Sequence, residues 1–318
     1  MAPLLEIRDL KKHFPLGSGL LQKRVRHLKA IDGVSFTIPE GETFGLVGES
    51  GCGKTTIGKI LLKLYEPTSG GVSFQGRDVT RLHGRSLVEY RKDIQAVLQN
   101  PYASLDGRMR IWRVVGEPLL VRGKGPRAVR RRVDELLDLV MLPRCGERFP
   151  HQLSAGQRQQ VAIARALAIH PKFIVLDEPT SLLDVSAQAS ILNLIVRLQR
   201  QFALTYLFIS HNLAVVRFVS NRVGVMYCGK LVELAESETL YTSARHPYTQ
   251  ALLSSVPDSD PDSDRQEIVL EGDVVSPIDP PEGCRFYSRC RERTDACARI
   301  EPPLRAAEED HLVACHLF

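Results

Sequence analysis

The stretch from Gly48 to Thr55 constrains the fold more than any other part of the chain. It reads Gly-Glu-Ser-Gly-Cys-Gly-Lys-Thr and fits the phosphate-binding loop pattern G-x-x-x-x-G-K-[S/T]. An apolar strand candidate that contains Phe44 and Val47 precedes the loop, and a helix candidate follows it. The apolar positions of that helix are Ile57, Ile60, Leu61 and Leu64. A strand, a glycine-rich loop and a helix in this order predict an α/β fold with a phosphate site.

The residue types in this loop fit the binding of a nucleoside triphosphate. Glycines let backbone N–H groups approach phosphates, and the N-terminus of the following helix favours negative charge. Lys54 can reach the β- and γ-phosphates, and the Thr55 hydroxyl can ligate Mg²⁺. The alternative is an ordinary glycine-rich turn, which the strand–helix context disfavours. The expected ATP-binding residues are Gly48, Glu49, Ser50, Gly51, Cys52, Gly53, Lys54, Thr55 and Thr56.

A second apolar run, residues 173–176, ends in the carboxylates Asp177 and Glu178. A buried parallel strand has this pattern, and it delivers polar groups at the edge of the sheet where ligands bind. We expect Asp177 to hold Mg²⁺ and Glu178 to polarise the attacking water, since phosphoryl transfer depends on positioning and charge stabilisation. A strand end capped by acidic residues is the simpler alternative.

Composition limits the class of protein. The chain has 318 residues, 43% of them apolar, which is enough for one large core with a small appendage. No apolar run approaches the roughly 18 residues that cross a bilayer, and no signal segment opens the chain. We therefore expect a cytosolic protein that reaches a membrane only through a partner. The net charge of +5 is mild, and the run Arg127–Arg132 fits an amphipathic helix with a solvated basic face better than a nucleic-acid site.

The pattern along the chain predicts a mostly parallel sheet with helices on both faces and an antiparallel β-layer beside it. The β-layer is expected within residues 4–44 and 72–79, with an inserted loop at 15–28. Residues 108–170 read as mostly helical, and 187–201 as a further helix. Strands are expected at 173–176, 205–210 and 222–227. The acidic, proline-broken stretch at 257–264 reads as a linker, which divides the chain into residues 1–256 and a C-terminal part, 257–318.

Four of the seven cysteines lie in this C-terminal part, at Cys284, Cys290, Cys297 and Cys315. A thiol cluster in a reducing compartment suggests a metal more than disulfides. Zinc sites usually contain a tight C-x₂₋₄-C pair, which is missing here, whereas iron–sulfur clusters accept more varied spacings. Free buried thiols are the third alternative. Cys52, Cys145 and Cys228 are scattered and are expected to be packing residues.

The segment Leu153-Ser154-Ala155-Gly156-Gln157 resembles the signature sequence of ABC transporter ATPases, with Ala155 where the family usually has a second glycine. Further family motifs follow in order. Gln99 is similar to the Q-loop glutamine, residues 181–184 with Asp184 to the D-loop, His211 to the switch histidine, and Phe14 to the aromatic residue that stacks on adenine. A lone Phe in a strand is more often a core residue, and His211 has the alternative of a buried structural histidine.

Residues 4–14 and the segment His246–Leu253, His-Pro-Tyr-Thr-Gln-Ala-Leu-Leu, are similar to the dipeptide/oligopeptide importer ATPases, and the first stretch to their F-type subunit. This resemblance covers essentially the whole chain. It implies the P-loop ABC ATPase fold with an antiparallel β-layer, a helical signature subdomain at about 108–170 and a small Cys-rich C-terminal extension. Tails of this kind in the family imply a [4Fe-4S] cluster on the four cysteines, with zinc as the alternative.

The resemblance also implies a mechanism and partners. The chain's own side would bind ATP and Mg²⁺ through Lys54, Thr55, Gln99, Asp177 and His211. Ser154, Gly156 and Gln157 would contact ATP held by a second ATPase subunit, a D-type partner. Closure of the pair would drive two membrane permease subunits fed by an external peptide-binding protein. The ATPase would then lie on the cytoplasmic face of the membrane, as a peripheral subunit that does not bind nucleic acid.

Other functions remain open at this point. The same machine could import nickel or glutathione, since those importers share the flanking segments. A soluble ABC ATPase acting on nucleic acid or ribosomes usually carries coiled-coil insertions or two cassettes, and neither is visible here. A regulatory module that holds ATP without turnover would be expected to lack Glu178 or His211, and both are present.

Overall fold

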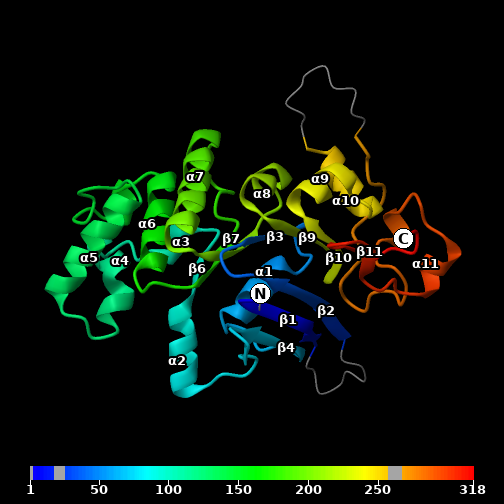
Figure 1. Cartoon of the computed structure of the whole chain (residues 1–318), viewed down its shortest axis with the longest axis horizontal. Coiled ribbons are helices and arrows are strands. Elements are labelled where there is room, and N and C mark those ends of the chain that lie inside the picture. The colour runs from blue at the N-terminus through cyan, green and yellow to red at the C-terminus, as the bar shows by residue number, and fades with distance from the viewer. Residues whose placement is uncertain (1–2, 18–25, 257–266) are drawn as a thin grey trace. The chain divides into compact units, whose positions relative to one another are not determined.

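The computed structural model describes residues 3–17, 26–256 and 267–318, and these form two compact units (Figure 1). Unit 1 comprises the described residues up to 39, residues 43–81, and those from 209 to the C-terminal end. Unit 2 comprises residues 40–42 and 82–208. Each unit is described by itself.

Unit 1 contains the antiparallel β-layer, in which the strand order is β2-β1-β4-β5. Buried positions alternate with more exposed ones over Leu5–Ile7 of β1 and Asp32–Ile38 of β2, as expected of a sheet with one face on the core. Leu5 of β1 pairs with Ile38 of β2 on one side and with Phe74 of β4 on the other. The strands are β1 (Leu5–Leu16), β2 (Arg26–Ile38), β4 (Ser69–Phe74) and β5 (Arg77–Asp78).

The second sheet of unit 1 has the strand order β11-β12-β10-β9-β3. β3 is buried along its whole length and runs parallel to β9, and α8 packs against it. The remaining strands are antiparallel to their neighbours. The strands are β3 (Thr43–Val47), β9 (Arg222–Tyr227), β10 (Lys230–Glu236), β11 (Arg305–Glu308) and β12 (His311–Val313).

The helices of unit 1 include the one that follows the phosphate-binding loop. It begins at Lys54 and buries Ile57, Ile60 and Leu61. The helices of unit 1 are α1 (Lys54–Leu61), α8 (Leu213–Val219), α9 (Ser237–Ser243), α10 (Pro247–Ser254), the 3₁₀ helix η2 (Tyr287–Arg289) and α11 (Asp295–Arg299). The C-terminal extension thus contributes two strands, β11 and β12, to the edge of the unit 1 sheet rather than folding apart from it (Figure 1).

Unit 2 combines a short parallel sheet with a helical part. The strand order is β8-β7-β6, and β6 pairs in parallel with β7. Helices α4, α5 and α6 pack on one another, and α6 also packs on α7. The elements are α2 (Gly84–Asp93), β6 (Ile94–Val97), α3 (Pro101–Ser104), α4 (Ile111–Leu120), α5 (Pro126–Leu139), the 3₁₀ helix η1 (Pro150–Gln152), α6 (Ala155–Leu167), β7 (Phe173–Asp177), α7 (Val185–Phe202) and β8 (Thr205–Ile209).

Most of the expected elements are present. The mostly helical stretch 108–170 contains α4 to α6, and the strands expected at 173–176, 205–210 and 222–227 are β7, β8 and β9. The basic run Arg127–Arg132 lies on α5, whose buried face consists of Val129, Val133, Leu136 and Leu137. Each such aliphatic side chain contributes roughly 1.5–3 kcal/mol when fully buried. The amphipathic reading of this helix is therefore confirmed.

The loop predicted at 15–28 extends too far at both ends. β1 continues to Leu16 and β2 begins at Arg26, because the two strands pair as far as Leu16 with Arg26. Residues 18–25 lie outside the described part, as does the whole of the expected linker at 257–264. The division at Val256 therefore stays a prediction.

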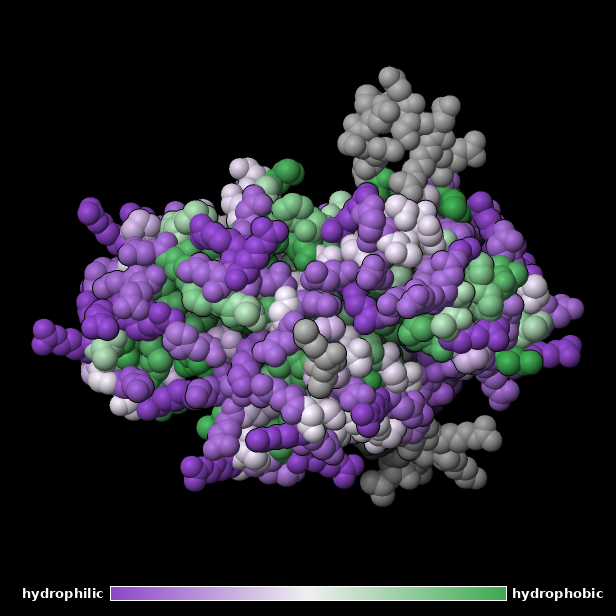
Figure 2. All heavy atoms as spheres, viewed as in Figure 1, coloured by the Kyte–Doolittle hydropathy of each residue, from purple (hydrophilic) through white to green (hydrophobic). Residues whose placement is uncertain are grey.

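Hydrophilic side chains cover most of the visible face, and hydrophobic residues form small separate patches among them (Figure 2). Among the described residues, no helix combines the length and the apolar character needed to cross a membrane.

Candidate nucleotide-binding site

The phosphate-binding loop of unit 1 is built so that glycine is required at two of its positions. Gly48 has φ +144°, and a Cβ there would lie 2.1 Å from the Met226 carbonyl oxygen. Gly53 has φ +113°, and its Cβ would lie 2.2 Å from the Ala30 carbonyl oxygen. Because any side chain at either residue would collide with backbone, strand neighbours β2 and β9 fix the path of the loop.

Lys54 lies at the first position of α1 and is 5% exposed. Its Nζ donates hydrogen bonds to the carbonyl oxygens of Gly48 at 2.7 Å and Glu49 at 2.9 Å. The ammonium group is therefore held inside the loop by two of the loop's own carbonyl oxygens. Thr55 is exposed beside it at the start of the helix. This is an arrangement that can bind the phosphates of a nucleotide.

Unit 2 brings together two of the predicted site residues. Gln99 Nε2 donates a hydrogen bond to Glu178 Oε2 at 2.8 Å, although the two residues are 79 positions apart. Asp177 is buried at the end of β7, 8% exposed, and Glu178 follows it with φ +47°. A left-handed backbone at a non-glycine residue is unusual and is concentrated at functional sites. The Glu178 carboxylate faces the side-chain amide of Gln99.

The signature segment forms the N-terminus of α6. Ser154 is its N-cap: its Oγ accepts from the Gln157 N–H at 3.2 Å, and Gln157 Oε1 accepts from the Ser154 N–H at 3.0 Å. This reciprocal capping box satisfies two backbone donors and leaves Ser154 exposed at the positive end of the helix. Asp184 similarly caps α7 by accepting from the Ala187 N–H at 2.9 Å.

Two predicted residues had a structural alternative. His211 is exposed in the turn between β8 and α8, so it is not the buried structural histidine that its position after an apolar strand allowed. Phe14, on β1, is half-buried rather than a core residue. Its ring packs edge-on against Tyr65 with centroids 5.5 Å apart, and the Lys12 ammonium lies 4.9 Å from its centroid.

The C-terminal extension contacts the phosphate-binding loop through residues that sequence reasoning missed. Arg289 of η2 donates from Nη1 to both carboxylate oxygens of Glu49, at 3.0 and 2.9 Å. Burial by itself would lower the pKa of Arg289, but its hydrogen bonds and charge interactions with Glu49 and Tyr227 together outweigh this effect and raise it. No sequence periodicity marks Arg289, because it lies in a short turn between cysteines.

The segment His246–Leu253 reaches the same loop. His246 is the N-cap of α10 and accepts from the Tyr248 N–H at 3.1 Å, while the Tyr248 hydroxyl accepts from the Glu49 N–H at 2.9 Å. The buried Glu233 carboxylate accepts from the backbone N–H groups of Arg245 and His246 and pairs with His311 of β12 at 2.7 Å. The segment therefore connects the extension to the phosphate-binding loop.

The four tail cysteines lie in one region of unit 1. Burial raises the pKa of Cys284, Cys290 and Cys315, and the charges of neighbouring tail thiols raise it further; the pKa of Cys284 reaches about 11. Four clustered thiols suit a soft metal or an iron–sulfur cluster chemically, but within the described residues no three His, Cys, Asp or Glu side chains are arranged to hold a metal ion. Cys52, Cys145 and Cys228 are buried, as expected of packing residues.

These features define a P-loop ATPase. A strand, a glycine-rich loop and a helix carry an inward lysine, and a pair of carboxylates follows a parallel strand. The ABC transporter family matches residues 31–181, and the C-terminal region of the oligopeptide/dipeptide transporters matches residues 232–297.

Relatives match over the whole chain. The oligopeptide transport ATP-binding protein AppF of Bacillus subtilis is 48% identical over 99% of this chain and 97% of its own. The di/tripeptide transport ATP-binding protein DppF of Pseudomonas aeruginosa is 44% identical over 99% and 98%. Among solved structures, the bacterial ABC transporter cassette MJ0796 is 29% identical with a TM-score of 0.65, covering 73% of this chain and 98% of that one. The cbiO1 subunit from Clostridium perfringens shares the fold, with a TM-score of 0.66 over 76% and 91%.

The chain belongs to the oligopeptide/dipeptide transport ATP-binding proteins of the ABC transporter family. It is an ABC ATPase, and its mixed sheet with an antiparallel β-layer is the fold that the sequence predicted.

Proposed function

We propose that this chain hydrolyses ATP to drive the import of di- and oligopeptides through a membrane permease. The observation that carries the proposal is the contact between the peptide-importer motif and the ATP loop. Tyr248 of that motif accepts a hydrogen bond from the Glu49 N–H of the loop. The segment that is typical of the importer class thus contacts the loop that would bind the phosphates of ATP.

The proposed roles of the residues follow from their chemistry. Lys54 and the backbone of residues 48–55 bind the phosphates, and Thr55, Gln99 and Asp177 hold Mg²⁺. Glu178 acts as general base for the attacking water, and its hydrogen bond from Gln99 orients it. His211 contacts the γ-phosphate, and Phe14 stacks on the adenine.

The complete transporter needs partners. Ser154, Gly156, Gln157 and Asp184 lie at or beside helix N-termini, which suits contact with the phosphates of ATP on a second subunit. We expect a heterodimer with a D-type ATPase, two permease subunits, and a peptide-binding protein on the outer side. Closure of the ATPase pair on ATP and its release after hydrolysis would switch the permease. The chain would then lie on the cytoplasmic membrane face.

Cys284, Cys290, Cys297 and Cys315 would hold a [4Fe-4S] cluster, or zinc as the alternative. The bound group would order a short extension that has little apolar core of its own.

Uptake tests the proposal and its substrate class together. Cells that carry only a Glu178→Gln copy of this chain are given labelled dipeptides, labelled oligopeptides and nickel. Loss of peptide uptake with normal nickel uptake supports the proposal. Loss of nickel uptake with normal peptide uptake would keep the ATPase and replace the substrate. Normal uptake of all three would contradict an importer of this class.

A further inference from the structure

Glu49 places a negative charge in a loop whose task is to bind an anion. The Glu49 side chain is 25% exposed, and the Arg289 side chain that pairs with it is 8% exposed. A carboxylate near bound phosphates repels them, and the repulsion is strong where little water screens it. Arg289 neutralises this charge from the C-terminal extension.

Arg289 belongs to a short, well-fixed segment, residues 284–290. Three successive backbone hydrogen bonds close it: Tyr287 to Cys284, Arg289 to Phe286, and Cys290 to Tyr287. Phe286 in its middle is 2% exposed and packs against the rings of Tyr227, Tyr248 and His246. The segment is therefore held in one place by its own turn and by an aromatic cluster.

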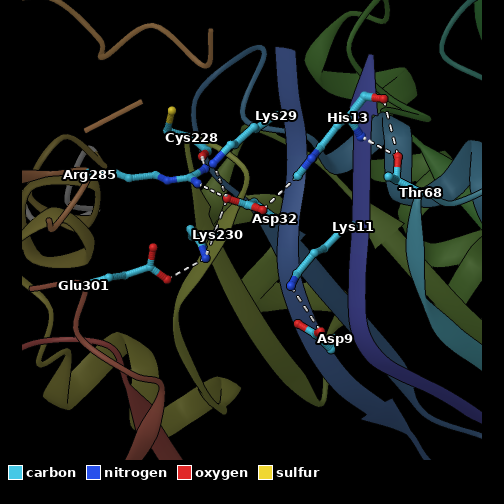
Figure 3. Close-up of polar contacts among 10 residues, drawn as sticks. All are labelled: Asp9, Lys11, His13, Lys29, Asp32, Thr68, Cys228, Lys230, Arg285 and Glu301. Carbon is cyan, nitrogen blue, oxygen red and sulfur yellow. Dashed lines mark hydrogen bonds and ion pairs between the residues drawn. The ribbon is translucent and has the colours of Figure 1, made fainter. Parts of the chain in front are cut away.

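A second arginine anchors the same segment to β2 and to the turn between β9 and β10. Arg285, with 4% of its side chain exposed, donates to the Asp32 carboxylate and to the Cys228 carbonyl oxygen (Figure 3). The next residue, Gly229, donates its N–H to the Cys52 carbonyl oxygen of the phosphate-binding loop at 2.9 Å and accepts from the Asp32 N–H. Arg285 thus fixes a turn that itself supports the loop.

Asp32 is a shared centre for this anchor. His13 lies 2.8 Å from its carboxylate, and Lys29 and Lys230 lie at 3.6 and 4.0 Å (Figure 3). Burial would raise the pKa of Asp32, but the hydrogen bond to His13 and the surrounding cations lower it. Asp32 therefore stays charged and keeps its hold on Arg285.

We propose that Arg289 is a positioning residue for the ATP site, which neutralises Glu49 and so lets the C-terminal extension set the affinity of the loop for ATP. The inference rests on the proposed ATPase function and deepens it. Arg285 holds the segment in the position from which Arg289 acts.

The test is the dissociation constant of Mg·ATP for the purified full chain. Arg289→Gln leaves the Glu49 charge uncompensated, and we expect affinity to fall about tenfold. Adding Glu49→Gln in the same chain removes that charge, and we expect affinity to return to within about threefold of wild type. Arg289→Lys keeps the charge and is expected to bind ATP nearly as well as wild type.

Arg291→Ala is the matched control, because Arg291 lies two residues further on, is 57% exposed and contacts Val269 and Glu271 instead of the loop. We expect no change in affinity. Thermal unfolding of each variant checks that it is folded. If the Arg289 variants do not fold, the single variant Glu49→Gln tests the inference. It leaves the positive charge of Arg289 uncompensated, so ATP should bind more tightly than to wild type, and unchanged affinity would overturn the inference.

The outcomes are distinct. Arg289→Gln could weaken ATP binding without recovery in the double variant that also carries Glu49→Gln. That result would make Arg289 a packing residue and overturn the inference. Unchanged affinity in Arg289→Gln, with wild type binding ATP, would also overturn it and leave the ATPase function intact. Wild-type protein that binds no ATP would overturn both.

Discussion

At the scale of single residues, the best-defined chemistry lies with Glu178. Its left-handed backbone and its hydrogen bond from Gln99 hold the carboxylate in one orientation. A general base needs this fixed orientation as well as its charge. Neither feature can be read from the Asp-Glu pair in the sequence, because both depend on the turn after β7 and on a loop 79 residues earlier.

Glu178→Gln is expected to retain ATP binding and to lose turnover, by about 10²-fold or more, because the amide cannot accept the proton from water. Equilibrium ATP binding and phosphate release measure the two steps separately. Glu89→Gln is the control, since Glu89 is 70% exposed on α2. Hydrolysis at the wild-type rate by the Glu178 variant would disprove the general-base assignment.

Gly53→Ala is expected to abolish ATP binding and to destabilise unit 1, because its Cβ would lie 2.2 Å from the Ala30 carbonyl oxygen. Gly76→Ala is the control, with φ +72° and nothing within 4 Å of the added Cβ. Gly76→Ala should lower the free energy of unfolding by only about 1 kcal/mol, because alanine is strained at a positive φ. Thermal unfolding and ATP titration compare the variants. Equal effects of the two substitutions would show that the loop can move away from Ala30.

At the scale of elements, α10 shows how a short helix can carry a family motif. His246 caps it, Pro247 suits its first turn, and Tyr248 reaches the phosphate-binding loop. Burial lowers the pKa of His246 to about 4, although the Glu233 charge opposes the shift. The imidazole is therefore neutral in the folded protein.

This low pKa predicts a loss of stability in acid. The unfolded chain takes up a proton on His246 below about pH 6.5, whereas the folded protein does so only near pH 4. The free energy of unfolding should therefore fall by about 2 kcal/mol between pH 7 and pH 5 on account of this group. The fall should be smaller by that amount in His246→Asn, which keeps a cap acceptor. An NMR titration of His246 near pH 6.5 in the folded protein would contradict the prediction.

At the scale of the whole molecule, the C-terminal extension is not an independent appendage. It adds β11 and β12 to the unit 1 sheet, and its His311 pairs with the buried Glu233. Its Arg289 pairs with Glu49 of the phosphate-binding loop, and its Arg285 pairs with Asp32. Changes in the extension should therefore reach the ATP site.

The cysteine cluster gives a prediction at the same scale. Protein prepared without oxygen should be brown and contain about four iron atoms per chain, if the thiols hold a [4Fe-4S] cluster. Cys284→Ser should lower the iron content, whereas Cys145→Ser, at a buried cysteine elsewhere, should not. Elemental analysis and the visible absorption spectrum measure both. Colourless protein with one zinc ion per chain would establish the alternative.

The sequence by itself determined the local features of this protein. The phosphate-binding loop, the strand that ends in Asp177, the signature at the start of α6 and the amphipathic α5 depend on neighbouring residues and on hydrophobic periodicity, so they could be recognised from the chain alone. The fold class and the family followed from the order of these motifs.

Only the tertiary structure decided which distant side chains meet. The pairs Gln99–Glu178, Arg289–Glu49 and Arg285–Asp32 join residues 79, 240 and 253 positions apart. No periodicity encodes such a pair, because a local pattern reports which face of an element a residue occupies and not which distant side chain it meets. The site's motifs are therefore local in the sequence, while the charges that tune its phosphate-binding loop arrive from the far end of the chain.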